Sequence, residues 1–140
     1  MKLPLIALAA VTLVAAPALA DGDAEKGAKE FNKCKACHAI VADDGTAIVK
    51  GGKTGPNLYG VVGRKAASEE GFKYGAGLVE LGETGLVWDE ALIAEYVTDP
   101  SKFVKDKTGD AAAKSNMTFK LAKGGADVAA YLASVAKPAQ

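Results

Sequence analysis

Five consecutive residues, Cys34-Lys35-Ala36-Cys37-His38, carry the most reactive side chains of this 140-residue chain. Two thiols three positions apart can form thioether bonds with the two vinyl groups on one edge of a porphyrin, and the imidazole that follows can ligate the iron. The chain has no other cysteine and no other histidine. The pattern therefore predicts one covalently attached haem c, with Cys34 and Cys37 as attachment points and His38 as an axial ligand.

Other chemistries use the same pair of cysteines. A Cys-x-x-Cys motif can be a thioredoxin-like dithiol, but that motif needs a βαβ setting, and no strand pattern flanks this one. A structural zinc site usually needs four Cys or His ligands, and this chain offers three. In an exported protein the pair could also close a small disulfide loop. We favour haem attachment, mainly because the chain also begins with an export signal.

The first 20 residues have the pattern of a secretory signal peptide. Lys2 precedes an apolar stretch, and the small-x-small site Ala18-Leu19-Ala20 follows it, so cleavage is expected after Ala20. The apolar stretch is short for a membrane span, which needs about 20 residues; an uncleaved anchor is the alternative. We therefore expect one mature domain, residues 21–140, in the periplasm and without stable insertion in a membrane.

The charge balance excludes one class of partner. The chain has 17 Lys and Arg residues against 17 Asp and Glu residues, and this near-zero net charge argues against a nucleic-acid partner.

Three segments are predicted to be helical. Asp89 is a good N-cap for the second of them, and Asp99 followed by Pro100 can end that helix and start another short turn. No convincing alternating strand pattern is present, and the Gly-, Thr-, Asp- and Lys-rich residues 41–65 are predicted to be loops. The chain is therefore predicted to be all-α with long loops. From caps and apolar spacing, the helices are expected at residues 23–33, 89–97 and 127–136.

The second axial position of the iron has one obvious candidate. Because Met1 leaves with the signal peptide, Met117 is the one methionine of the mature chain. A thioether ligand paired with imidazole raises the reduction potential of haem iron. A lone methionine is more often core filler, but Met117 lies in the polar, loop-like segment Ser115-Asn116-Met117-Thr118-Phe119. We expect Met117 to ligate the iron; a lysine ligand or an open site is the alternative.

Further motifs follow the pentapeptide in order: Thr54-Gly55-Pro56-Asn57-Leu58, Gly63-Arg64, Phe72-Lys73-Tyr74, Trp88, Tyr96, Pro100, Met117, Phe119 and Tyr131. Their order and spacing resemble a class I c-type cytochrome, most closely a bacterial cytochrome c2, over nearly all of residues 21–137. The resemblance implies the cytochrome c fold, in which several helices and long loops wrap around one covalently attached haem. The sequence Ala113-Lys114-Ser115-Asn116 departs from the Pro-Gly-Thr-Lys that short members often place before the ligand methionine.

The resemblance also implies roles for residues around the haem. The carbonyl of Pro56 would accept the distal ring proton of His38 and raise the basicity of the ring. Tyr74 and Trp88 would hydrogen-bond one haem propionate. Arg64 would lie near the propionates as a partly buried countercharge.

The same resemblance places two further contacts. Tyr96 would reach the sulfur of Met117 and tune the iron, and Phe119 would belong to the haem pocket. Gly27, Phe31 and Tyr131 would form the contact between the first and last helices, where glycine permits close approach.

These features predict a one-electron carrier that works as a monomer. Small electron carriers need a weak contact with their partners and steering by charge. The resemblance implies electron transfer from a cytochrome bc1 complex to a photosynthetic reaction centre or a terminal oxidase. A haem enzyme or gas-binding protein with an open sixth site, and a fixed subunit of a larger complex, are the rivals. The lysines expected to dock an acidic partner are Lys33, Lys35, Lys53, Lys102, Lys105, Lys114, Lys120 and Lys123.

Overall fold

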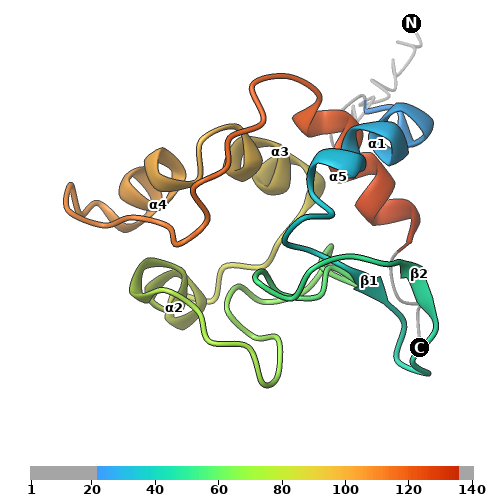
Figure 1. Ribbon diagram of the computed structural model, residues 1–140. Helices are drawn as coiled ribbons and strands as arrows, with labels where there is room; N and C mark the ends of the chain where they lie inside the picture. Colours follow the sequence, from blue (N-terminus) through green and yellow to red (C-terminus); the bar gives the residue numbers. More distant parts are fainter. Residues whose placement is uncertain (1–21, 136–140) are drawn as a thin grey trace, which may run out of the picture.

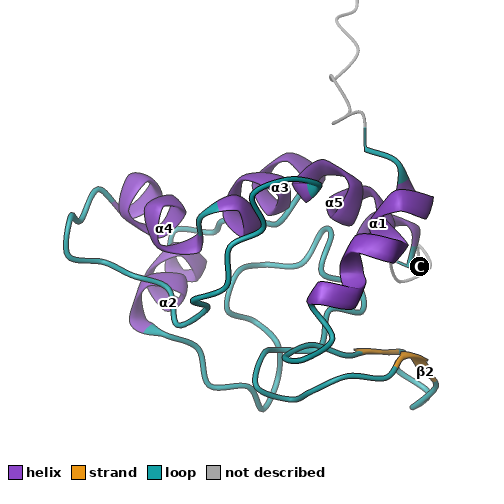
Figure 2. Cartoon of the chain, turned by 45° about the horizontal axis from the view of Figure 1, so that its top comes forward, coloured by secondary structure: helices purple, strands orange, loops and turns teal. Residues whose placement is uncertain are grey.

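The computed structural model of the chain describes residues 22–135, so the signal peptide predicted for residues 1–20 lies outside the described part. Short helices joined by long loops make up most of this part, with one small β-hairpin (Figure 1, Figure 2). The elements are α1 (Ala24–Glu30), the 3-10 turn η1 (Phe31–Lys33), β1 (Ile40–Val41), β2 (Ala47–Val49), α2 (Ala76–Glu83), α3 (Glu90–Thr98), α4 (Pro100–Thr108) and α5 (Gly125–Ser134). The helices contact one another in the order α1, α5, α3, α4 and α2. None of these helices is long and apolar enough to cross a membrane.

Aspartate side chains begin three of the helices, as their sequence positions predict. Asp23 accepts hydrogen bonds from backbone N–H groups of the first turn of α1, and Asp89 does the same for α3. Asp99 caps α4, with Pro100 at its first helical position. Each carboxylate satisfies backbone donors that have no partner inside the helix. The capping predictions at Asp89 and Asp99 are therefore confirmed.

Helix α1 crosses α5 at a position where a side chain would not fit. A Cβ atom on Gly27 would lie 1.9 Å from the carbonyl oxygen of Asp127 and 2.8 Å from Cβ of Tyr131. One turn further on, the rings of Phe31 and Tyr131 have their centroids 5.6 Å apart, and Phe31 is fully buried. The backbone N–H of Asp23 also donates to the Asp127 carboxylate over 2.8 Å. The predicted contact between the first and last helices is confirmed.

The boundaries of the predicted helices need small corrections. The first helix ends at Glu30 and continues as η1, which leads directly into Cys34. The last helix begins at Gly125, two residues earlier than predicted, and its described part ends at Ser134. The expected short turn at Pro100 is a nine-residue helix, because Phe103 and Val104 are buried on its inner face.

Two elements were not expected from the sequence. Strands β1 and β2 pair in an antiparallel hairpin inside the region predicted to be loops; strands of two and three residues are too short to give an alternating pattern. Helix α2 is also unexpected, since Gly77 and Gly82 lower its helix propensity. Both glycines lie against neighbouring segments: a Cβ on Gly77 would be 2.3 Å from a methyl group of Val104. Close packing onto α4 therefore overrides the weak local preference.

Candidate functional site

The pentapeptide that holds the two cysteines forms a tight turn directly after η1. The N–H of Cys34 donates to the carbonyl of Phe31 over 2.9 Å, and the N–H of His38 donates to the carbonyl of Cys34 over 2.9 Å. Cys34 is half-buried and Cys37 is exposed, and the two form no disulfide bond. Burial, with a further contribution from the charge of Glu30, raises the pKa of the Cys34 thiol. A redox dithiol needs a thiol whose pKa is lowered, so this environment disfavours the thioredoxin-like alternative.

His38 is held in one orientation by the segment that follows the hairpin. Its Nδ1 atom lies 2.8 Å from the carbonyl oxygen of Pro56. Because a carbonyl oxygen only accepts, Nδ1 donates its proton and Nε2 keeps the lone pair that a metal ion needs. Burial lowers the pKa of His38 below its ordinary value, against the opposing effect of the Pro56 carbonyl. Gly55 lies directly on the ring, since a Cβ there would be 2.2 Å from Cε1 of His38.

Asn57 ties this segment to the hairpin. Its side-chain amide donates to the carbonyl of Val41 over 2.8 Å, and its side-chain oxygen accepts from the N–H groups of Val41 and Tyr59. These bonds hold the chain at Pro56, and so hold the carbonyl that orients His38. Asn57 was part of a recognised motif, but its link to Val41 was not predicted.

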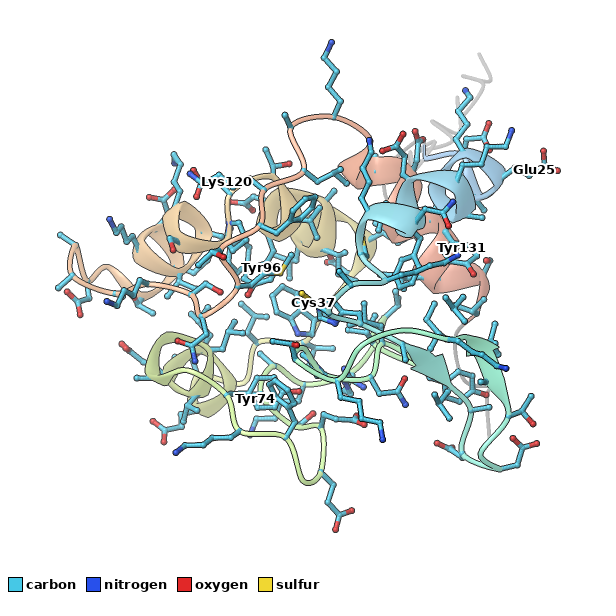
Figure 3. All side chains as sticks on the ribbon, viewed as in Figure 1. Glu25, Cys37, Tyr74, Tyr96, Lys120 and Tyr131 are labelled. Carbon is cyan, nitrogen blue, oxygen red and sulfur yellow. The ribbon has the colours of Figure 1, made fainter. Side chains whose placement is uncertain are left out.

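One cavity of about 370 Å³ unites the residues predicted to bind a haem. Its lining is mainly apolar and comes from segments spread over most of the described chain. Figure 3 labels three of the lining residues, Cys37, Tyr74 and Tyr96, which lie around the middle of the molecule in this view. The predicted site residues that line the cavity are Cys34, Cys37, His38, Pro56, Arg64, Tyr74, Trp88, Tyr96, Met117 and Phe119.

No other arrangement in residues 22–135 suits a metal ion, because no group of three or more His, Cys, Asp or Glu side chains comes together there. The donor set at the cavity instead fits a haem c. Two thiols, one imidazole with a free Nε2 and one thioether line a single apolar space. That set could supply two covalent attachment points and two axial ligands of the type found in cytochromes c.

Ser115 organises the loop that carries Met117. Its hydroxyl oxygen accepts from the N–H of Met117 over 3.0 Å and lies 2.6 Å from the hydroxyl of Tyr96. Its backbone N–H donates to the hydroxyl of Ser101 over 3.2 Å, and the residue is 7% exposed. The sequence predicted that Tyr96 reaches the sulfur of Met117; in the structure its hydroxyl has Ser115 as its partner. The prediction therefore placed Tyr96 against the correct loop but did not name Ser115 as the residue that it bonds.

Two aromatic rings that line the cavity, Trp88 and Tyr96, pack together with Phe103, which lies outside the lining. The ring centroid of Trp88 lies 5.2 Å from that of Tyr96 and 5.6 Å from that of Phe103. Tyr96 and Phe103 meet edge to face, with centroids 5.4 Å apart. Burial raises the pKa of the Tyr96 hydroxyl, against the effect of its bond with Ser115. The rings that the sequence assigned to the haem pocket therefore also pack as core.

Arg64 and Tyr74 both contact Glu69, a residue that was not singled out from the sequence: Arg64 bonds its carboxylate and Tyr74 its backbone N–H. The guanidinium of Arg64 donates to Glu69 over 2.6 Å, and its side chain is 15% exposed. The N–H of Glu69 donates to the hydroxyl of Tyr74 over 3.2 Å. Burial, together with the Glu69 charge, raises the pKa of the Tyr74 hydroxyl, although its hydrogen bond with Glu69 and the Arg64 charge oppose this. Arg64 is partly buried, as predicted, but its countercharge within the chain is Glu69.

All eight predicted docking lysines are exposed. Three of them make ion pairs on the surface: Lys33 with Glu30, Lys102 with Asp106, and Lys120 with Asp99. Phe119 is 41% exposed although it lines the cavity. The five docking lysines without an ion pair inside residues 22–135 are Lys35, Lys53, Lys105, Lys114 and Lys123.

Characterised proteins are similar to this chain over most of its length. It is 62% identical over 136 residues to cytochrome c-550 of Paracoccus versutus, a match that covers 95% of this chain and 88% of that protein. It is 62% identical over 138 residues to cytochrome c2 of Rhodobacter capsulatus, covering 98% of this chain and 100% of that protein. No family model matches the chain.

Solved structures are similar as well. The structure of cytochrome c2 from Rhodobacter capsulatus matches with a TM-score of 0.81 and 65% identity, covering 81% of this chain and 98% of that one. The structure of ferric cytochrome c-550 from Paracoccus versutus matches with a TM-score of 0.80 and 66% identity, covering 82% and 98%. These matches confirm the fold predicted from the sequence.

Proposed function

The chain belongs to the class I c-type cytochromes, with the cytochromes c2 and c-550, and we propose that it is a periplasmic one-electron shuttle that takes electrons from a cytochrome bc1 complex and delivers them to a photosynthetic reaction centre or a terminal oxidase. Like its relatives, it is an electron carrier rather than an enzyme, and it carries one covalently attached haem c. We further propose which residues hold the haem, where the protein works and which partners it serves.

We assign the haem to the cavity on the basis of its donor atoms. Cys34 and Cys37 would form the two thioether bonds, each S–H adding across one vinyl group. His38 and Met117 would be the axial ligands. The observation that carries this assignment is that the single histidine of the chain and Met117 line the same cavity as both cysteines, while Pro56 holds the imidazole proton on Nδ1.

When bound, the haem supplies reversible one-electron exchange between ferrous and ferric iron. The protein residues keep that exchange free of side reactions. Pro56 orients the His38 ring and raises its basicity as a ligand. Ser115 fixes the backbone of Met117, so that the thioether is held at the cavity. The apolar lining excludes water that would compete for the iron.

The docking surface that we propose is the exposed ring of Phe119 together with the eight docking lysines. Phe119 lines the cavity and is 41% exposed, so it offers a partner an apolar contact next to the proposed haem site. Exposed lysines speed association with an acidic partner through long-range attraction, and a small apolar contact keeps the complex short-lived. Both properties suit a shuttle that must leave its partner after each electron.

Electron-transfer rates with isolated cytochrome bc1 complex test this function. Stopped-flow mixing over a series of salt concentrations should give second-order rates that fall steeply as salt rises, because salt screens exposed charges. Lys53→Gln and Lys114→Gln remove charges next to cavity-lining residues and should slow the reaction at low salt. Lys29→Gln, on the exposed face of α1, makes the same charge change away from the cavity and should not.

Two results would contradict the proposal: rates that do not depend on salt, or an equal loss of rate in Lys29→Gln. The location has a separate test. If residues 1–20 are a cleaved export signal, the protein purified from the periplasmic fraction begins at Asp21; an N-terminal sequence that begins at Met1 contradicts the export proposal. Size-exclusion chromatography of the same preparation tests the expected monomer.

A further inference from the structure

Three of the five N–H groups of the Arg64 guanidinium donate hydrogen bonds inside the protein. Nη1 donates to the carboxylate of Glu69 over 2.6 Å and to the carbonyl of Tyr59 over 3.4 Å, and Nη2 donates to the carbonyl of Asn57 over 3.0 Å. The side chains of Arg64 and Glu69 are 15% and 28% exposed. Arg64 is therefore much less exposed than the lysines of the surface ion pairs, which are 35% to 70% exposed.

The ion pair matters because Arg64 lines the haem cavity. The cationic side chains in the lining are Lys33, Arg64 and Lys73, and no Asp or Glu belongs to it. A haem c brings two negatively charged propionates to this space. Lys33 and Lys73 are exposed, whereas the Arg64 side chain is only 15% exposed, so Arg64 is the most buried positive charge in the lining that could offset the propionates. Glu69 neutralises that charge from outside the cavity.

The conformation of the turn that carries Glu69 is fixed by contacts within the protein. Ala67 has a φ of 55°, in the left-handed region that residues with a Cβ rarely adopt. The hydroxyl of Ser68 donates to the carbonyl of Lys65 over 2.6 Å, and the N–H of Glu69 donates to Tyr74 over 3.2 Å. A strained backbone persists where surrounding contacts impose it. These contacts direct the Glu69 carboxylate to Arg64.

We propose that Glu69 is a positioning residue for Arg64 that lowers the reduction potential of the haem. Its carboxylate holds the guanidinium and offsets its positive charge, and less positive charge at the cavity favours ferric over ferrous iron. The inference rests on the proposed assignment of the haem to this cavity. It does not depend on which partner proteins the carrier uses.

Redox titration of the holoprotein, followed by its visible spectrum, tests the proposal. Glu69→Gln keeps the size and the hydrogen-bonding oxygen of the side chain but removes its charge. The ratio of reduced to oxidised protein at a fixed ambient potential should rise by about threefold to tenfold. A tenfold rise corresponds to an increase of about 59 mV in the reduction potential for one electron. Glu70→Gln makes the same charge change on the neighbouring, exposed residue and should change this ratio by less than about twofold.

A second pair of variants asks whether Glu69 acts through Arg64. In an Arg64→Gln background, Glu69→Gln should change the ratio by less than half as much, on a logarithmic scale, as it does in the native chain. An unchanged effect in that background overturns the positioning role, and so does an equal effect of Glu69→Gln and Glu70→Gln. Failure of the proposed iron ligation would be visible separately, because the spectrum of the unaltered holoprotein would then lack the features of methionine ligation.

Discussion

Where α1 crosses α5, the contact depends on close packing, whereas the loops around the cavity are joined mainly by hydrogen bonds. The crossing brings Gly27 against the backbone of α5 and buries Phe31. The loops are joined by pairs of residues far apart in the sequence, such as Tyr96 with Ser115 and His38 with Pro56. The crossing places the start of the pentapeptide, and the hydrogen bonds orient the side chains that do chemistry. Variants of the first region should therefore change stability, and variants of the second should also change the properties of the iron.

The largest effect on stability is expected at the helix crossing. Gly27→Ala places a Cβ 1.9 Å from a backbone oxygen of α5, so the two helices must move apart. The free energy of unfolding of the holoprotein should fall by about 2 to 3 kcal/mol, although alanine favours a helix by about 1 kcal/mol over glycine. Denaturant titration measures this loss.

Lys29→Ala on the exposed face of the same helix is the matched control. Its free energy of unfolding should stay within about 0.5 kcal/mol of that of the native protein. The visible spectrum of folded Gly27→Ala should remain that of the native protein. If Gly27→Ala is as stable as the control, the crossing is not set by close packing; if its spectrum changes, the two regions are not separable.

A smaller loss of stability, with a change at the iron, is expected at Ser115. Ser115→Ala leaves the hydroxyl of Tyr96 and the N–H of Met117 without their partner, which costs about 1 to 2 kcal/mol in a buried site. The Met117 loop should also detach more easily, so added imidazole should bind the ferric protein at lower concentration. Spectral titration with imidazole measures this.

Ser134→Ala removes a hydroxyl that bonds only within α5, over 2.6 Å to the carbonyl of Tyr131, and is the control for loss of a serine. It should leave the imidazole titration unchanged, as should Gly27→Ala. If Ser115→Ala lowers the free energy of unfolding without any change in imidazole binding, then the loops around the cavity do not differ from the helix crossing in their effect on the iron.

The smallest effect is expected at Asp99, which joins helix α4 to the Met117 loop. Its carboxylate caps α4 and pairs with Lys120 of the Met117 loop over 2.7 Å. The Lys120 ammonium and the N–H of Lys102 hold the pKa of Asp99 below its ordinary value of 3.8. The ionised form therefore contributes stability above pH 3.8, and this contribution is lost as the pH falls through the lowered pKa of the folded state.

Asp99→Asn keeps a capping side chain but removes the charge, so it isolates the ionic contribution. Thermal melts should give the native chain a higher melting temperature than Asp99→Asn at neutral pH. This difference in melting temperature should shrink as the pH is lowered below about 4 and as salt is added. If the difference in melting temperature is the same at every pH, the ion pair of Asp99 with Lys120 contributes nothing to the stability of the protein.

The helices could be predicted from the sequence better than the loops, for physical reasons, whereas the contact between α1 and α5 was predicted only through the resemblance to class I c-type cytochromes. Caps such as Asp89 and apolar spacing act within a few residues, so they can be seen in a linear sequence. The pentapeptide carries its chemistry within five positions. Helix α2 was missed because its stability comes from packing of Gly77 against α4 rather than from local preference. Ser115 and Glu69 were not identified as positioning residues because their partners are set by the folded loops.

The visible spectrum of the oxidised holoprotein tests the central claim, that His38 and Met117 hold the iron. A far-red sulfur-to-iron charge-transfer band should be present in the native protein and absent in Met117→Ala. Thr118→Ala, an exposed change at the next residue, should keep the band. The claim is contradicted if the native protein lacks the band, or if Met117→Ala retains it.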